Sequence, residues 1–186
     1  MSTVAKLTLD EYDLMIGSGV FDRRERRHLE LIRGEIRERA TIGPMHEVMV
    51  DRLNEWSFKS LPKGKVRVRV QNSIGLLCLE SAPEPDIAWV ARRDYSQGRP
   101  TEKDVLLVIE VAESSLQYDC GEKADLYAAA GVADYWVVNL PGRSIEVRRD
   151  PAEGRYRSVQ THTSDDEVRP LLVPEVVLRP SMLWKG

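Results

Sequence analysis

Apolar residues recur at helical spacing in one long segment of the chain, which begins at Pro44. The apolar positions of this segment are Met45, Met49, Leu53 and Trp56. Because residues three or four apart share one face of a helix, the spacing predicts an amphipathic helix from Pro44 to about Leu61. Its apolar stripe would pack into the core, and Pro62-Lys63-Gly64 would end it.

Two shorter helices are marked by the residues at their ends. Thr8-Leu9-Asp10-Glu11 has the form of a capping box, in which the threonine and glutamate side chains bind free backbone N–H groups. A helix is therefore predicted to start there and to end by Gly17 to Gly19. A similar pattern at residues 119–122 predicts a helix with Asp119 as its N-cap, closed by Gly131.

Residues with strand character fill most of the remaining chain. A β-hairpin is predicted where segments 29–31 and 35–39 flank Arg33-Gly34, because glycine can adopt the positive backbone angle of a tight turn. Segment 104–112 is apolar almost throughout, which indicates a central strand covered on both faces. Further strands are predicted over residues 65–70, 74–79, 86–91 and 135–138, with a C-terminal meander over 144–149 and 156–160.

The chain is long enough for one domain with a sizeable core. It has 186 residues, of which 42% are hydrophobic and 31% are charged, as in an ordinary folded protein. We expect a single domain over residues 1–186, because no repeat or interdomain linker interrupts the sequence. Within it, residues 1–40 would form an N-terminal helix and hairpin arm, and residues 141–186 a C-terminal β extension.

The formal net charge is small and negative, at -3, and the pI is near 5.7. This balance argues against a protein that coats nucleic acid through bulk positive charge, so a polyanionic partner would have to be bound locally. One basic group lies within residues 23–27, and another is formed by Lys65, Arg67 and Arg69 on one side of an alternating segment. Either group alone is typical of a solvated face or sheet edge.

The two cysteines indicate the redox compartment. Cys78 and Cys120 are far apart and lack the spacing of a metal motif, so we expect reduced, semi-buried thiols and a cytoplasmic location. The N-terminus lacks the apolar core of a signal peptide, and the apolar runs are far shorter than the roughly 20 residues that span a bilayer. No membrane insertion is therefore expected.

Three charged residues, Asp86, Glu110 and Lys123, surround the most apolar stretch of the chain. A glutamate buried among branched aliphatic residues is costly unless a metal, a cation or hydrogen bonds compensate. If segments 86–91 and 104–112 are antiparallel neighbours, Asp86 lies beside Glu110, and two converging carboxylates favour a shared proton or a hard divalent cation such as Mg²⁺. Lys123 could reach the same point to orient or deprotonate a water, or to stabilise charge on a phosphate oxygen.

Several of these segments together resemble a known family. They are Pro85-Asp86, Val108-Ile109-Glu110-Val111, Ser114 to Asp119, Lys123 with Tyr127, and residues 131–136, and the likeness extends over about residues 7–184. The family is the Uma-type restriction endonucleases of the PD-(D/E)XK nuclease superfamily. The resemblance implies an α/β (α+β) fold, with a restriction-endonuclease-like mixed β-sheet flanked by helices and a nuclease-like core over residues 44–140.

The same resemblance implies an activity and a site. The activity is the hydrolysis of DNA phosphodiester bonds by an endonuclease that depends on Mg²⁺ or Mn²⁺. Asp86, Glu110 and Lys123 would be catalytic, and the two acids with the Val111 backbone carbonyl would bind the metal. Because cutting both strands needs two sites, we expect a homodimer.

The sequence departs from the superfamily pattern at Ala112, where the usual lysine would stand two residues after the strand acid. It resembles instead those branches in which the lysine has moved to the following helix, where Lys123 lies. Each of four auxiliary candidates also has an ordinary structural alternative, such as an exposed hairpin carboxylate, a capping histidine or a core tyrosine. They are Glu35 for a second metal or its water, His46 for phosphate, Gln71 for a metal-bound water, and Tyr127 for phosphate or for steadying the lysine.

Other chemistries lack their sequence motifs. The chain contains no G-x-x-x-x-G-K-[ST], no G-x-G-x-x-G and no H-E-x-x-H, and its three histidines are scattered. Two alternatives to an active nuclease stay open. One is a nuclease-fold module that binds nucleic acid or acts as a scaffold without effective chemistry, which the acidic pI favours. The other is a buried network of the acids and the lysine that only stabilises the fold.

Overall fold

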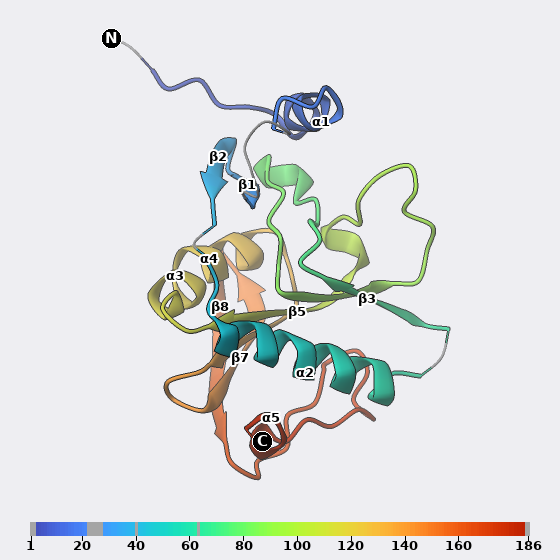
Figure 1. Ribbon diagram of the computed structural model, residues 1–186, viewed down its shortest axis with the longest axis vertical. Coiled ribbons are helices and arrows are strands. Elements are labelled where there is room, and N and C mark those ends of the chain that lie inside the picture. Colours follow the sequence, from blue (N-terminus) through green and yellow to red (C-terminus); the bar gives the residue numbers. More distant parts are fainter. Residues whose placement is uncertain (1–2, 22–27, 40, 63, 185–186) are drawn as a thin grey trace.

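A six-stranded mixed sheet forms the centre of the protein (Figure 1). The computed structural model describes residues 3–21, 28–39, 41–62 and 64–184, so the basic group within residues 23–27 lies outside the described residues. The strands follow the order β3-β4-β5-β6-β7-β8, and every neighbouring pair is antiparallel except β5 and β6, which are parallel. Their bounds are Val66–Val70 (β3), Ile87–Ala91 (β4), Val105–Ala112 (β5), Asp134–Asn139 (β6), Ser144–Ala152 (β7) and Arg155–Thr163 (β8).

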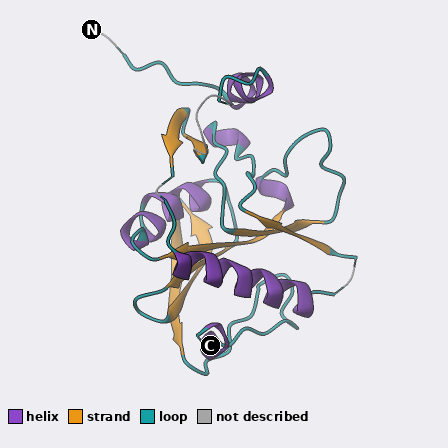
Figure 2. Ribbon diagram, in the orientation of Figure 1, coloured by secondary structure: helices purple, strands orange, loops and turns teal. Residues whose placement is uncertain are grey.

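Helices cover both faces of this sheet (Figure 2). Helix α2 (Pro44–Ser60) lies on one face, where Trp56 stacks on Trp89 of β4 with ring centroids 5.2 Å apart. Helices α3 (Leu116–Cys120) and α4 (Glu122–Ala129) form the crossover between the parallel strands β5 and β6 and pack on the other face. The apolar character of β5 follows from this position, because an interior strand has no face in water.

The N-terminal arm consists of α1 (Leu9–Gly17) and a separate two-stranded hairpin of β1 (Leu29–Ile32) and β2 (Glu35–Glu38). The capping box of Thr8 and Glu11 is formed as predicted. The hairpin turns through Arg33 and Gly34, whose φ angles are 51° and 79°, the left-handed pair that a two-residue turn requires. The backbone N–H of Arg33 donates to Ser81, which ties the hairpin to the loop before β4.

The predicted helix from Pro44, the hairpin, the central strand and the C-terminal meander are all confirmed. The strand predicted over residues 74–79 is wrong. Gly75 and Leu76 make only isolated bridges, a 3₁₀ turn η1 follows at Leu77–Leu79, and Glu80 adopts a left-handed φ of 43°. The apolar run is nonetheless explained, because Ile74 and Leu76 are fully buried beneath the sheet face that α4 covers.

Two smaller predictions also differ from the structure. Asp119 is not the N-cap of α4, because it lies inside α3 and Gly121 occupies the cap position. Cys78 is exposed and not semi-buried as predicted, whereas Cys120 is half-buried as predicted, and neither thiol forms a disulfide. A second 3₁₀ turn, η2 (Glu102–Asp104), precedes β5, and α5 (Pro180–Leu183) is the last helix of the described chain.

None of the helices in the described ranges combines the length and the apolar character needed to cross a membrane.

Candidate active site

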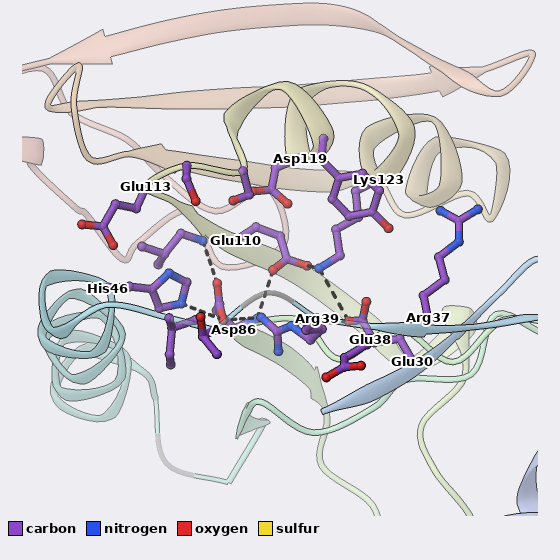
Figure 3. Close-up of a pocket in the computed structure, with 16 residues that line it drawn as sticks. Glu30, Arg37, Glu38, Arg39, His46, Asp86, Glu110, Glu113, Asp119 and Lys123 are labelled. Atoms are coloured by element: carbon purple, nitrogen blue, oxygen red, sulfur yellow. Dashed lines mark hydrogen bonds and ion pairs between the residues drawn. The ribbon is translucent and has the colours of Figure 1, made fainter. Parts of the chain in front are cut away.

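A cavity of about 380 Å³ opens where β4 begins and β5 ends, between the hairpin, α2 and the α3–α4 crossover (Figure 3). Side chains from all of these elements meet in it, although they are far apart in the sequence. The charged residues that line the cavity are Glu30, Arg37, Glu38, Arg39, Asp86, Glu110, Glu113, Asp119 and Lys123, with His46 beside them.

Asp86 and Glu110 converge because β4 and β5 are antiparallel, with Ile87 paired to Ile109. The backbone N–H of Asp86 donates to Glu110 Oε2 at 3.3 Å, and the backbone N–H of Val111 donates to Asp86 Oδ2 at 2.9 Å. Both acids are about 1% exposed. Each carboxylate therefore accepts a backbone N–H from the other strand, just beyond the last paired residues of β4 and β5. Both side chains also face the cavity.

Two cations neutralise these buried acids. Lys123 Nζ lies 2.8 Å from Glu110 Oε1, and Arg39 Nη2 donates to Asp86 Oδ1 at 2.9 Å. Both cations also face Glu30, whose Oε1 is 3.6 Å from Lys123 Nζ and 3.8 Å from Arg39 Nε. The result is one connected network of three carboxylates and two cations, which is the condition for keeping buried charges in a folded protein.

The position of Lys123 follows from the break between α3 and α4. Gly121 separates the two short helices, and Lys123 stands in the first turn of α4 with its side chain directed back over the strand ends. One helical turn later, Tyr127 Oη donates to Glu110 Oε1 at 2.8 Å. Tyr127 thus holds the same carboxylate oxygen as Lys123, rather than the lysine itself.

The other three auxiliary candidates lie at different places relative to the cavity. His46, near the start of α2, lines the cavity with its Nε2 3.1 Å from Asp86 Oδ1, but this buried nitrogen has no aligned hydrogen-bond partner among the described residues. Gln71 Nε2 lies 3.4 Å from the same Asp86 oxygen, from a position outside the cavity lining. The structure does not bring Glu35 to the cavity, because Glu35 pairs with Lys6 and Arg37 at the surface of the hairpin.

The network sets opposite pKa shifts on its two central acids. Burial by itself would raise the pKa of Asp86, but the neighbouring His46, Arg39 and Lys123 together hold it well below its usual range. Burial raises the pKa of Glu110 to about 7, with Lys123 opposing and Asp86 reinforcing the rise. Lys123 keeps its proton, because Glu110 and Glu30 raise its pKa against the opposing effect of burial.

Two members of the site, Glu30 and Arg39, were not predicted from the sequence. Glu30 is 3% exposed and lies between Leu29 and Leu31, so it carries the same signal that identified Glu110, a carboxylate among aliphatic residues. Its backbone partner is the N–H of Glu84, at 2.7 Å. Arg39 directly follows β2 in a segment rich in charge, and no local pattern sets it apart.

The residues present fit a hard divalent cation in their donor chemistry. Two carboxylates meet at one point, and the Val111 carbonyl faces the same side as the Val111 N–H, because a strand residue directs both groups to one neighbour. No group of three or more His, Cys, Asp or Glu side chains suited to a metal occurs in the described part of the chain. The carbonyl and water molecules would therefore complete the shell, a ligand set that suits Mg²⁺.

The sheet, its helices and the paired acids at adjacent strand ends define a nuclease-fold protein of the α+β class. A solved structure titled as a putative nuclease belonging to DUF820, from Anabaena variabilis ATCC 29413, superposes with a TM-score of 0.70 at 16% identity. The match covers 96% of this chain and 97% of that one. The family model Uma2, described as "Putative restriction endonuclease", matches residues 9–181, so the chain belongs to the Uma2 family. None of the curated proteins compared with the chain matches it.

Proposed function

We propose that the protein is a divalent-metal-dependent endonuclease that hydrolyses phosphodiester bonds in DNA. The observation that carries the proposal is the meeting of Asp86, Glu110 and the Lys123 ammonium in one open cavity of a Uma2-family chain. A purely structural network would have no need of an opening to solvent. The proposal includes Mg²⁺ or Mn²⁺ as the cofactor.

Each residue has a role that follows from its contacts. Asp86, Glu110 and the Val111 carbonyl would hold the cation, which would supply charge to polarise the phosphate and activate a water. Lys123 is held as an ammonium, so it would donate a hydrogen bond to a phosphate oxygen or to the attacking water rather than remove a proton. Tyr127 holds the Glu110 carboxylate in place, and Glu30 holds the Lys123 ammonium.

The reaction itself needs an attack in line with the leaving group. The oxygen of a water molecule would attack the phosphorus while the bond from phosphorus to the leaving sugar oxygen breaks. The attacking water would release one proton to solvent, and the departing oxygen would take up one proton from solvent. Charge grows on the non-bridging oxygens during this step, and the fixed cations of the cavity suit that change because they are already oriented.

One observation favours a second candidate, a nuclease-fold module that binds nucleic acid without cleavage. Each carboxylate oxygen of Asp86 and Glu110 already accepts a hydrogen bond within the protein. A cation must therefore compete with Arg39 for Asp86. A protein in which that competition always failed would keep the fold and lose the chemistry.

Cleavage of supercoiled plasmid DNA in Mg²⁺ or Mn²⁺ tests the proposal. Asp86→Asn and Glu110→Gln keep the shape of each side chain, and each should lower the cleavage rate by roughly 10²- to 10⁴-fold, the range for loss of a catalytic group. Lys103→Ala removes an exposed lysine outside the cavity and controls for the loss of one positive charge in Lys123→Ala, while the melting temperature shows whether Lys123→Ala is folded.

A binding measurement separates the two candidates. Either cation should raise the melting temperature of the wild-type protein, and Asp86→Asn should abolish the rise, because a ligand that binds only the folded state stabilises it. Cleavage that persists unchanged in Asp86→Asn and Lys123→Ala would refute the proposed site. Absence of any metal response and of any cleavage would favour the binding module.

A further inference from the structure

A row of cations lies on β3, an edge strand of the sheet, and the site described above does not use it. Arg67 and Arg69 alternate with apolar residues along this strand, so both project from the same face. Their cross-strand partners on β4 are Val90 and Ala88, which belong to the core on the α4 side. Glu110 and Asp86 stand on that face too, so the row and the acids share one side of the sheet.

The C-terminal end of β3 lies next to Asp86. Gln71 follows Arg69 by two residues, which is about 6.6 Å along an extended strand. The backbone N–H of Gln71 donates to the carbonyl oxygen of Asp86 at 3.1 Å, and its side-chain amide lies 3.4 Å from Asp86 Oδ1. A chain bound along Arg67 and Arg69 would therefore be directed to the end of β4 where the cavity opens.

These cations are not held in ion pairs, although one carboxylate lies near Arg67. Hydrogen bonds from Ser96 lower the pKa of Asp94, and the charge of Arg67 lowers it further. Neither Arg67 nor Arg69 forms an ion pair with any acid in the described ranges. Arg69 is partly buried, and its Nε has no hydrogen-bond partner there. Burial lowers the pKa of the Arg69 guanidinium, and the charges of Arg67 and Arg99 lower it further. The charged neighbours that act on Arg69 are therefore the cations Arg67 and Arg99, while the nearby Tyr95 opposes their effect on its pKa.

Arg99 is a second arginine with an unused N–H hydrogen-bond donor. One of its terminal nitrogens pairs with Asp13, while the buried Nη1 has no hydrogen-bond partner among the described residues. Tyr95 lies beside Arg69, with the ring centroid 6.0 Å from the guanidinium carbon. A cation that only keeps a sheet edge soluble can stay fully hydrated, so it does not need to be half-buried with unused N–H groups.

We propose that Arg67, Arg69 and Arg99 bind the phosphates of a nucleic-acid backbone and direct that strand to the cavity. Arginine suits this role because its planar fork of donors matches phosphate oxygens. The proposal rests on the proposed function, since it names the surface through which the substrate would be held. It is compatible with the acidic pI, because a local group of arginines can bind phosphates whatever the sign of the net charge.

The test is the salt dependence of DNA binding without divalent cations, where cleavage is not needed. Binding of a fluorescently labelled duplex is followed by anisotropy between about 50 and 200 mM salt, over which phosphate contacts weaken strongly. The double variant Arg67→Ala/Arg69→Ala should reduce the slope of log K against log salt by about 1.8, at about 0.9 per lost contact. Arg67→Lys/Arg69→Lys should keep most of the slope, because it keeps the charge.

The matched control is Arg155→Ala/Arg157→Ala. These two arginines are exposed on β8, the opposite edge strand of the same sheet, and their removal changes the net charge equally. Circular dichroism and the melting temperature show that each variant is folded. The control should leave the slope close to that of the wild-type protein.

The outcomes separate this inference from the proposed function. A reduced slope in the β3 variant alone supports the inference, even if the wild-type protein cleaves nothing, and the protein is then a binding module. An unchanged slope, or an equal loss in the β8 control, overturns the inference even if metal-dependent cleavage is intact. A change of oligomeric state in the β3 variant with an unchanged slope assigns the edge to contact between copies and also overturns it. No DNA binding by the wild-type protein overturns the inference, and the cleavage assay in Mg²⁺ or Mn²⁺ then decides the proposed function by itself.

Discussion

Glu110 should make the stability of this protein fall as the pH rises through neutrality. Its carboxyl group is buried, and burial raises its pKa to about 7 from an ordinary value of 4.5. The folded protein therefore holds this proton more tightly than the unfolded chain between about pH 4.5 and 7. Since stability decreases with pH wherever the folded state binds more protons, the favourable contribution is complete below pH 4.5 and is lost as the pH approaches 7.

The size of the effect follows from the difference in pKa. A rise of about 2.5, at about 1.4 kcal/mol for each pKa unit, corresponds to roughly 3 kcal/mol in the free energy of unfolding. Glu110→Gln keeps the shape of the side chain and its capacity to accept hydrogen bonds from Lys123 and Tyr127, but it does not titrate. The stability of the variant relative to wild type should therefore increase by roughly 3 kcal/mol from about pH 4.5 to about pH 7.5.

Denaturant unfolding of both proteins across this range measures the difference directly. Comparing the two proteins cancels the groups that do not interact with Glu110, and Asp86 stays ionised over this range because its pKa lies well below its usual value. Glu113→Gln, which removes an exposed carboxylate of the same cavity, is the control and should show no such trend. A difference between Glu110→Gln and wild type that stays flat with pH would refute the reasoning, because it would mean that Lys123 keeps Glu110 ionised throughout.

Three further perturbations test other parts of the structure. Arg39→Gln should bind Mn²⁺ about tenfold more tightly by calorimetry, the result of losing about 1.4 kcal/mol of competition for Asp86, and equal or weaker binding would contradict this competition. Lys123→Met should lower the free energy of unfolding by about 3–5 kcal/mol, because it leaves Glu110 buried and unpaired, and a neutral effect in denaturant titrations would show that the pair is dispensable for folding. Gly34→Ala should lower the melting temperature through a cost of about 1–2 kcal/mol for a left-handed residue, and an unchanged melting temperature would show that the hairpin turn relaxes.

The elements that the sequence predicted correctly are those with a strong local signal. The apolar stripe of α2, the capping box of α1 and the alternation along β3 each reflect the environment of single side chains, so each is legible without the rest of the fold. The segment 74–79 shows the limit of this reasoning. Its apolar residues are buried, but burial alone does not distinguish a strand from a turn that inserts side chains into the core.

The sequence predicted that the two acids of the candidate site converge, but it did not predict all of the residues around them. Asp86 and Glu110 could be brought together from strand order alone, and Lys123 required the resemblance to a family. Glu30 and Arg39 join the network through the hairpin, whose position over the strand ends depends on contacts such as that between Arg33 and Ser81. No periodicity in the sequence encodes that long-range contact.

The parallel pairing of β5 with β6 also has a consequence for the order of folding. The β6–β7–β8 meander joins neighbours in the sequence and can form early, whereas β5 and β6 can pair only after the intervening α3–α4 crossover has closed. That same crossover carries Lys123, and the hairpin that carries Glu30 precedes it by about 90 residues. The charged network is thus assembled from segments that meet late, so a partly folded or nascent chain would have the separate residues of the site without the site itself.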